Sequence, residues 1–233
     1  MSTLNVDKVD PSTGTALEIG SSGDTITVPS GATFVVAGTT EITGTNNVQR
    51  PNAQPLIING DMQVAQRGTS STGVTATGFY ACDRWNYEGN DASTLTITQE
   101  SLTSGDAFAD GFSKSFKLDV TTADASVTSN DYAILDYSME GQNVQFFKKG
   151  TANALTYTLA FWVKATKTGT NIVELNDGSN SRLISGSYTI SVADTWEYKI
   201  INYAADTTGT IPNDNSGRLF LYFWLMAGIN YTS

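Results

Sequence analysis

Residues 155–163 read Leu-Thr-Tyr-Thr-Leu-Ala-Phe-Trp-Val, and this stretch decides the fold class of the 233-residue chain. Apolar and polar side chains alternate at its start, and the stretch becomes apolar towards Val163. This pattern is typical of a β-strand in the middle of a sheet. Thr, Tyr, Phe, Trp and Val are also residues that strands prefer. The stretch therefore predicts a long central strand.

Further strands are predicted on both sides of that stretch, each bounded by turn residues. They are expected over 94–98, 115–120, 171–175, 187–192, 195–201 and 219–225. Several strands at spacings of about 8–12 residues indicate an all-β sandwich or jelly roll. We assign this β-sandwich to residues 56–233. One short helix is predicted over 137–149.

Residues 1–47 differ from the rest because they contain no Trp, Tyr or Cys and only one Phe. Short apolar pairs with period 2 are separated here by glycines. They are Leu17 and Ile19, Ile26 and Val28, and Phe34 and Val36. A segment this thin cannot bury these side chains alone, which leaves disorder or burial against copies of itself. The regular pairs favour a trimeric, intertwined β-stalk, followed by a proline-containing linker over 48–55.

Composition excludes several classes of partner. The formal net charge is −10, and no cluster of basic residues exceeds the pair Lys148-Lys149. This charge distribution predicts no binding to nucleic acid or to an anionic membrane. No stretch approaches the roughly 20 apolar residues of a membrane span, and the N-terminus lacks a secretory signal pattern. We therefore expect synthesis in a cytoplasm without membrane insertion. The single cysteine, Cys82, is interpreted as a small buried hydrophobe.

The chain contains no histidine, which excludes Ser-His-Asp and Cys-His catalysis and histidine-ligated zinc. Paired carboxylates are the catalytic machinery that remains. Glu174 and Glu197 lie in strands that could be neighbours, but no glutamate belongs to a clustered motif. We therefore predict that the chain is not an enzyme and uses no cofactor or metal. The oxygen-rich stretches 176–180 and 213–216 could ligate Ca²⁺, but such sequences are more often plain β-turns.

Candidate ligand-binding residues are the aromatic and amide side chains expected in loops, because loops at the ends of a sandwich are exposed. They are Tyr80, Tyr87, Asn90, Asn230 and Tyr231. The strand tryptophans Trp162, Trp196 and Trp224 are predicted to fill the core, with a glycan platform as the alternative. The triplet Asp83-Arg84-Trp85 has two interpretations, a structural ion pair or an Arg84 stacked on Trp85 that holds a ligand.

Several stretches carry a resemblance to a known family. The segments STLNVDKV (2–9), GTALEIG (14–20) and GDTITVPSGA (23–32) resemble the start and stalk of tail fibre proteins of marine phages, including those of cyanobacteria. The segment LIINGDMQVAQRG (56–68) resembles the beginning of that family's globular body. Residues 159–165, with Thr195-Trp196-Glu197 downstream, are similar to carbohydrate-binding-module-like jelly rolls.

The resemblance implies a virion protein that forms a homotrimer. Residues 1–47 would attach to the phage tail or its adaptor, and the distal body would adhere to a host surface glycan or lipopolysaccharide. Family members continue beyond the 219–225 strand, so the resemblance also implies a sandwich that is incomplete at its C-terminal end. Three alternatives remain open. They are a head or collar fibre, a tailspike that degrades polysaccharide, and a bacterial carbohydrate-binding module.

Overall fold

A computed structural model describes residues 56–232 of the chain, and the predicted stalk and linker lie outside these described residues. The described part is nearly all β, which confirms the predicted fold class. Its ten strands are β1 (Ser70–Val74), β2 (Trp85–Asn90), β3 (Thr94–Ser101), β4 (Lys114–Thr122), β5 (Tyr132–Glu140), β6 (Tyr157–Val163), β7 (Gly169–Asp177), β8 (Arg182–Ile190), β9 (Glu197–Tyr203) and β10 (Gly217–Ala227). The short helices are α1 (Asp106–Ala109), η1 (Gly141–Asn143), η2 (Gln145–Phe147) and η3 (Ile229–Tyr231).

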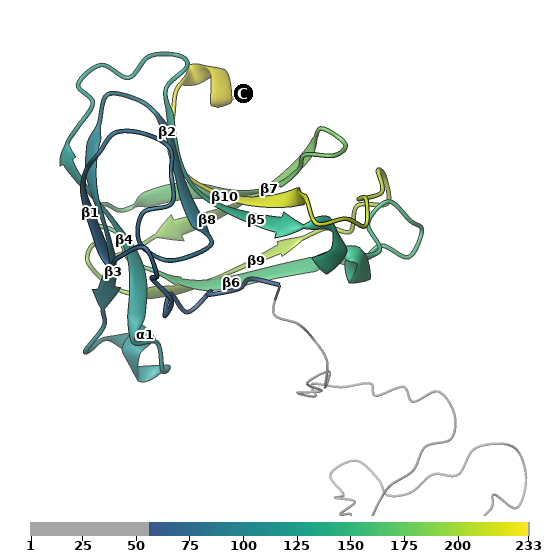
Figure 1. The fold of residues 1–233 in the computed structure, drawn as a ribbon, viewed down its shortest axis with the longest axis horizontal. Helices are drawn as coiled ribbons and strands as arrows, with labels where there is room; N and C mark the ends of the chain where they lie inside the picture. The colour runs from purple at the N-terminus through teal and green to yellow at the C-terminus, as the bar shows by residue number, and fades with distance from the viewer. Residues whose placement is uncertain (1–55, 233) are drawn as a thin grey trace, which may run out of the picture. The chain divides into compact units, whose positions relative to one another are not determined.

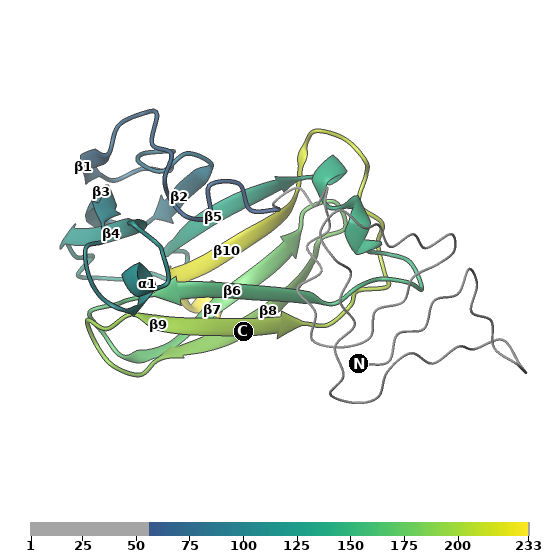
Figure 2. The same ribbon diagram turned by 90° about the horizontal axis from the view of Figure 1, so that it is seen from below.

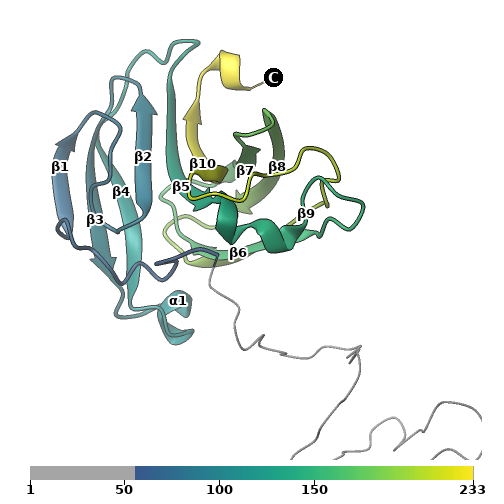
Figure 3. The same cartoon turned by 45° about the vertical axis from the view of Figure 1, so that its right-hand side comes forward.

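The strands form three antiparallel sheets (Figure 1). The largest has five strands in the order β2-β5-β10-β7-β8, and the others are β1-β3-β4 and β6-β9. Figure 2 shows β6 and β9 side by side across the five-stranded sheet, and Figure 3 shows the three-stranded sheet standing beside β2. The chain thus builds a sandwich with one large sheet on one side and two smaller sheets on the other.

Two hydrophobic clusters hold the sheets together. The larger lies between the five-stranded sheet and β6-β9, and Tyr137, Leu221 and Tyr203 are among its buried members. The smaller includes Tyr87 and Ile97 and joins the three-stranded sheet to β2. Because side chains alternate across a strand, the residues between these core positions point to the opposite side of the five-stranded sheet. We call that opposite side the outer face.

The predicted helix over 137–149 is wrong in its first part. Residues up to Glu140 complete strand β5, and two separate 3₁₀ turns follow. Tyr137 and Met139 are buried at period 2 in this strand. Pairing of β5 with both β2 and β10 satisfies its backbone, so tertiary contacts override the weak helical pattern. The seven predicted strands are all present, with their ends shifted by a few residues.

The prediction that the strand tryptophans fill the core is also wrong. Trp162 is partly exposed on the outward side of β6, directly opposite the exposed Tyr198. Trp196 precedes β9 and carries the Lys164 ammonium 5.4 Å from its ring centroid. Trp224 is partly exposed on the outer face. The buried tryptophan is Trp85, which contacts Tyr137 in the larger cluster.

The segment 56–68 forms a clasp with the Asp83-Arg84-Trp85 triplet. The Asn59 side chain donates to the carbonyl oxygens of Val64 and Asp83, each at 2.9 Å. It also accepts a hydrogen bond from the Val64 amide at 2.8 Å. The Trp85 indole in turn donates to the Asn59 carbonyl at 3.1 Å. Asn59 has a φ of 60°, a left-handed conformation that asparagine tolerates better than most residues.

Candidate functional site

An open groove of about 500 Å³ lies where this clasp meets the outer face. This volume is within the range of typical ligand sites. The clasp contributes Asn59, Arg67 and Arg84 to its lining, and strand β5 contributes Ser138 and Glu140. Asn215 and Gly217 also line it, so four separate segments of the chain meet in the groove.

The groove combines an exposed aromatic ring with two guanidinium groups. Phe79 is 49% exposed, and the Arg67 guanidinium lies 5.4 Å from its ring centroid. Arg67 also pairs with Asp83 at 3.4 Å, and Arg84 pairs with Glu140 at 3.6 Å. Both ion pairs are long and partly exposed, so the guanidinium groups keep hydrogen-bonding capacity for a ligand.

The backbone around the groove explains how these side chains are presented. Gly78 exchanges two hydrogen bonds with Tyr87 of β2, at 2.9 and 3.0 Å, which holds the neighbouring Phe79 at the rim. Arg84 has a φ of 74°, a left-handed conformation that costs energy in a residue with a Cβ. Arg84 lies over the Tyr137 ring at 5.9 Å and not over Trp85. Of the two interpretations of the triplet, the stacking of Arg84 on Trp85 is therefore not realised, and Arg84 takes part in an ion pair with Glu140.

Beside the groove, the outer face carries a row of polar and aromatic residues that crosses all five strands. Direct pairing aligns Asn86 with Asp136, Asp136 with Tyr222, Tyr222 with Glu174, and Glu174 with Ser185. We call these five residues the acid–aromatic row. Ser138, two residues after Asp136 in β5, belongs to the groove lining, so the groove lies next to the row.

Hydrogen bonds orient the members of this row. The Asn86 amide lies 3.4 Å from an Asp136 oxygen and 3.3 Å from a Glu88 oxygen. The Trp224 indole donates to Glu174 at 3.2 Å, and the Asn176 amide donates to the same carboxylate at 3.0 Å. In contrast, Oδ1 of Asn86 and Oδ1 of Asp136 are buried and have no hydrogen-bond partner.

Burial, followed by the nearby negative charge of Glu88, raises the pKa of Asp136 to about 6. Burial also raises the pKa of Glu88. The pKa of Tyr222 is raised above its usual range, first by burial and then by Asp136, Glu88 and Glu174. The site thus holds negative charge that neighbouring side chains do not compensate.

Replacing Asp136 by asparagine is expected to stabilise the protein at pH 8. Asp136 faces Asn86 and Glu88 on β2 and Tyr222 on β10, none of which is cationic. Because its folded pKa of about 6 exceeds the unfolded value, native stability falls as pH rises from about 4 to 6 and stays low above that. A shift of about 2 units corresponds to at most about 3 kcal/mol.

The measurement is urea denaturation of both proteins between pH 4 and pH 8. The variant should gain most at pH 8, and the two stability curves should converge near pH 4. A variant whose stability relative to the parent does not change with pH would show that Asp136 ionises normally.

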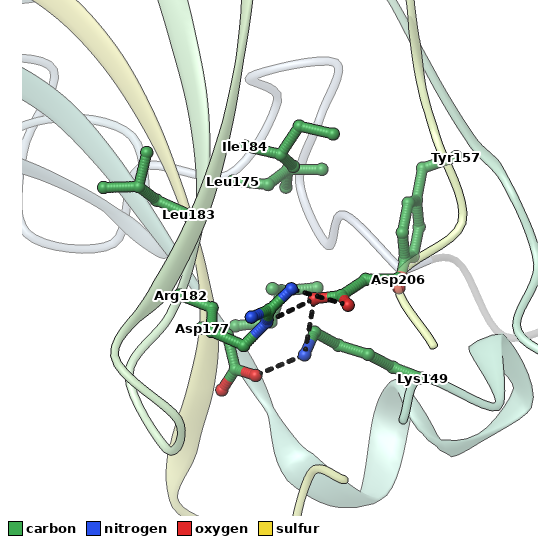
Figure 4. A pocket seen from close by; sticks show the side chains of 9 residues that line it. Lys149, Tyr157, Leu175, Asp177, Arg182, Leu183, Ile184 and Asp206 are labelled. Carbon is green, nitrogen blue, oxygen red and sulfur yellow. Dashed lines mark hydrogen bonds and ion pairs between the residues drawn. The ribbon is translucent and has the colours of Figure 1, made fainter. Parts of the chain in front are cut away.

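Figure 4 shows a second site, a cavity of about 30 Å³ built around the buried Lys149. The Lys149 ammonium lies 2.6 Å from Asp177 and 3.1 Å from Asp206. It also donates to the carbonyl oxygens of Thr208 and Gly209, each at 3.0 Å. Arg182 pairs with Asp206 at 2.9 Å, and this contact is the main reason that the pKa of Asp206 is below its usual range. The charged groups are paired internally, so this site ties three segments together, whereas the buried Tyr157 hydroxyl that also lines the cavity has no hydrogen-bond partner.

The two oxygen-rich turns use their carboxylates in the same internal way. Asp177 accepts hydrogen bonds from the backbone amides of Ser179 and Asn180 and pairs with Lys149. Asp214 binds the Arg218 guanidinium. Among residues 56–232, no group of three or more acidic, cysteine or histidine side chains has the arrangement of a metal site. Both carboxylates thus hold parts of the fold together through internal hydrogen bonds and ion pairs.

Of the five predicted ligand-binding residues, three gather at one end of the outer face. Asn90 and Asn230 both donate to Asn130, at 3.1 and 2.7 Å. Tyr231 packs against Trp224, with ring centroids 5.7 Å apart.

The other two residues lie elsewhere. Tyr80 donates to the Ala76 carbonyl at 2.6 Å and packs against the smaller cluster. Tyr87 was expected in a loop, but it lies in strand β2 and is 1% exposed. The sequence did not predict this strand, because the charged Glu88 is followed by Gly89 and Asn90, which are uncommon in strands.

The pairing of Glu174 with Glu197 suggested by strand order does not occur. Glu174 lies on the five-stranded sheet, whereas Glu197 belongs to β9 and pairs with Lys199 at 2.6 Å. Other carboxylates on the outer face are Asp136 of β5 and Glu88 of β2, and they lie close to each other at the Asn86 amide. The sequence did not reveal them, because neither β2 nor the first part of β5 was predicted as a strand and the end of β5 was assigned to a helix.

The described residues form an antiparallel β-sandwich with an open groove at the edge of its largest sheet. No protein-family model and no curated protein matches the chain. Among solved structures, the chain is similar to the enzymatically active domain of tailspike protein 4 of bacteriophage CBA120, with 16% identity and a TM-score of 0.37. The match covers 63% of this chain and 18% of that chain.

This finding corrects the prediction that the chain is not an enzyme. The similar structure is that of a domain described as enzymatically active. The prediction also rested on the absence of clustered carboxylates in the sequence. In the structure, the carboxylates of Glu88 and Asp136 lie together, because both are within hydrogen-bond distance of the Asn86 amide.

Within residues 56–232, no helix is long and apolar enough to cross a membrane.

Proposed function

We propose that the chain is a phage tail fibre protein of the virion and that its body adheres to the host surface through the groove. The observation that carries this proposal is the exposed Phe79 ring beside Arg67 and Arg84 in a groove of about 500 Å³. Sugar rings pack their C–H faces on aromatic side chains, and guanidinium groups donate hydrogen bonds to sugar oxygens. A surface glycan or lipopolysaccharide supplies both features.

The resemblance of residues 2–32 to phage fibres supports the rest of the proposal. Residues 1–47 attach the protein to the tail or its adaptor and form the stalk of a homotrimer. The groove then lies on the distal body, where it reaches the cell surface.

Particles carrying a chain that lacks residues 1–47 are expected to contain no fibre. Normal fibre content in electron micrographs of such particles would contradict the attachment role.

Replacing Phe79 by alanine tests the adhesion role. Loss of a central aromatic contact typically costs 1.4 kcal/mol or more, so phage adsorption to host cells should slow roughly tenfold or more. The melting temperature should change little, because half of the ring is already exposed. Adsorption rate constants are measured on phage that carry either the parent chain or the variant.

Phe108→Ala provides a matched control, because Phe108 is 44% exposed in α1 and does not line the groove. Its adsorption rate should equal that of the parent. Equal adsorption by the Phe79 variant and the parent would overturn the proposal that the groove binds the host.

A further inference from the structure

We propose that the acid–aromatic row is a saccharide subsite that accepts neutral sugar units and rejects acidic ones. This inference rests on the proposed host adhesion, because it specifies the chemistry of the ligand that the same outer face would take. It concerns Asn86, Asp136, Tyr222, Glu174 and Ser185, together with the neighbouring Glu88 and Trp224.

Two buried acceptor atoms of the row have no hydrogen-bond partner. Asp136 and Asn86 are 6% and 7% exposed, and each has an Oδ1 atom without a donor. A buried acceptor without a partner costs free energy, so the site favours a ligand that donates hydrogen bonds. The two residues are directly paired across β2 and β5, which places both acceptors under one region of the outer face. The partly exposed Glu88 accepts a hydrogen bond from the Asn86 amide at the same place.

The carboxylates of this region would repel an acidic sugar. The region contains the carboxylates of Glu88, Asp136 and Glu174. Among the described outer-face residues of these strands, the cation is Arg218, and its guanidinium is bound to Asp214 at 2.5 and 3.0 Å. An acidic sugar would bring a further negative charge beside these carboxylates, and like charges in a poorly solvated site repel strongly. Hydroxyl groups supply donors without this penalty.

The aromatic side chains of β10 form a surface on which a sugar ring can pack. Phe220, Tyr222 and Trp224 alternate along the outer face and are all partly exposed. Phe220 and Tyr222 are stacked with ring centroids 5.9 Å apart, and the Trp224 ring is held by its hydrogen bond to Glu174. Such fixed aromatic surfaces match the apolar faces of sugar rings.

The groove and the acid–aromatic row are neighbours along strand β5. Ser138 of the groove and Asp136 of the row are two residues apart on β5, a distance of about 7 Å along a strand. An oligosaccharide that enters the groove beside Phe79 therefore continues over Asp136 and Tyr222. The row thus extends the proposed groove and determines which sugar units follow.

The test measures binding of hexasaccharides to the purified full chain by titration calorimetry and tryptophan fluorescence at pH 8. The probes are the neutral maltohexaose, cellohexaose and N-acetylated chitohexaose, the acidic hexagalacturonate, and the cationic hexaglucosamine. We expect at least one neutral probe to bind ten or more times more tightly than hexagalacturonate. Trp224→Phe should remove the fluorescence change while leaving calorimetric binding detectable.

Tyr222→Ala should weaken neutral binding at least tenfold, whereas Tyr198→Ala should not, because Tyr198 is exposed on the opposite side of the sandwich. Asp136→Asn preserves the shape of the site but removes a negative charge. It should therefore reduce the ratio between the affinity for the neutral probe and the affinity for hexagalacturonate. This conservative variant keeps the inference testable if Tyr222→Ala does not fold.

Equal binding of neutral and acidic probes, binding of hexaglucosamine alone, or no binding of the neutral probes would each overturn the inference. Failure of the host-adhesion proposal appears elsewhere, as normal adsorption of Phe79→Ala phage. The two results are independent, because the saccharide titrations use purified protein and no cells.

Discussion

Lys149→Met is expected to lower the free energy of unfolding by about 3–5 kcal/mol, because it leaves a buried carboxylate without its cation. Asp177 is 2% exposed, and Lys149 lies 2.6 Å from it. Arg182 remains paired with Asp206 in the variant, so it does not replace the lost charge at Asp177. The loss is a large share of the stability of a typical domain.

Urea denaturation at pH 7 measures the effect, and Lys148→Met is the matched control. Lys148 is the preceding residue and is exposed, so the same substitution there should change stability by no more than about 0.5 kcal/mol. Equal stabilities of the two variants at pH 7 would show that the buried ion pair contributes nothing.

Trp85→Ala is expected to cost about 3–5 kcal/mol of stability through the cavity that it leaves. The Trp85 ring packs 5.0 Å from Tyr137 and 6.2 Å from Phe223, and its indole holds the clasp through Asn59. Trp162→Ala removes the same side chain from a partly exposed position on β6, so its cost should be about 1 kcal/mol.

The comparison uses thermal and urea unfolding of the two alanine variants under identical conditions. Because the substitution is the same, the difference reports the local environment alone. Similar losses for both variants, or a larger loss for Trp162, would contradict the assignment of Trp85 to the core and of Trp162 to the surface.

Much of the local structure follows from the amino-acid sequence. Alternation with period 2 located strands β3, β4, β6, β7, β8, β9 and β10, and turn residues separated them. The small apolar character of Cys82 predicted its burial, which raises the pKa of its thiol to about 11. These features depend on near neighbours in the chain, so a single sequence contains the information.

Only the tertiary structure decided which side of each strand is covered. Alternation shows that Phe161 and Trp162 point in opposite directions, but it does not say which one meets the five-stranded sheet. Phe161 meets it and contacts Phe223, so Trp162 faces outward. The tryptophan predictions failed because a large apolar residue in a strand is compatible with either side.

The candidate site depended still more on tertiary structure. Asn86, Asp136 and Glu174 are far apart in the sequence and meet only because β2, β5, β10 and β7 pair in one register. A shift of one residue in any of these pairings would turn the affected side chain to the core. The sequence by itself determined that the chain forms strands and what chemistry they carry. Long-range pairing decided which of those side chains share a surface, because register is set by packing between distant segments.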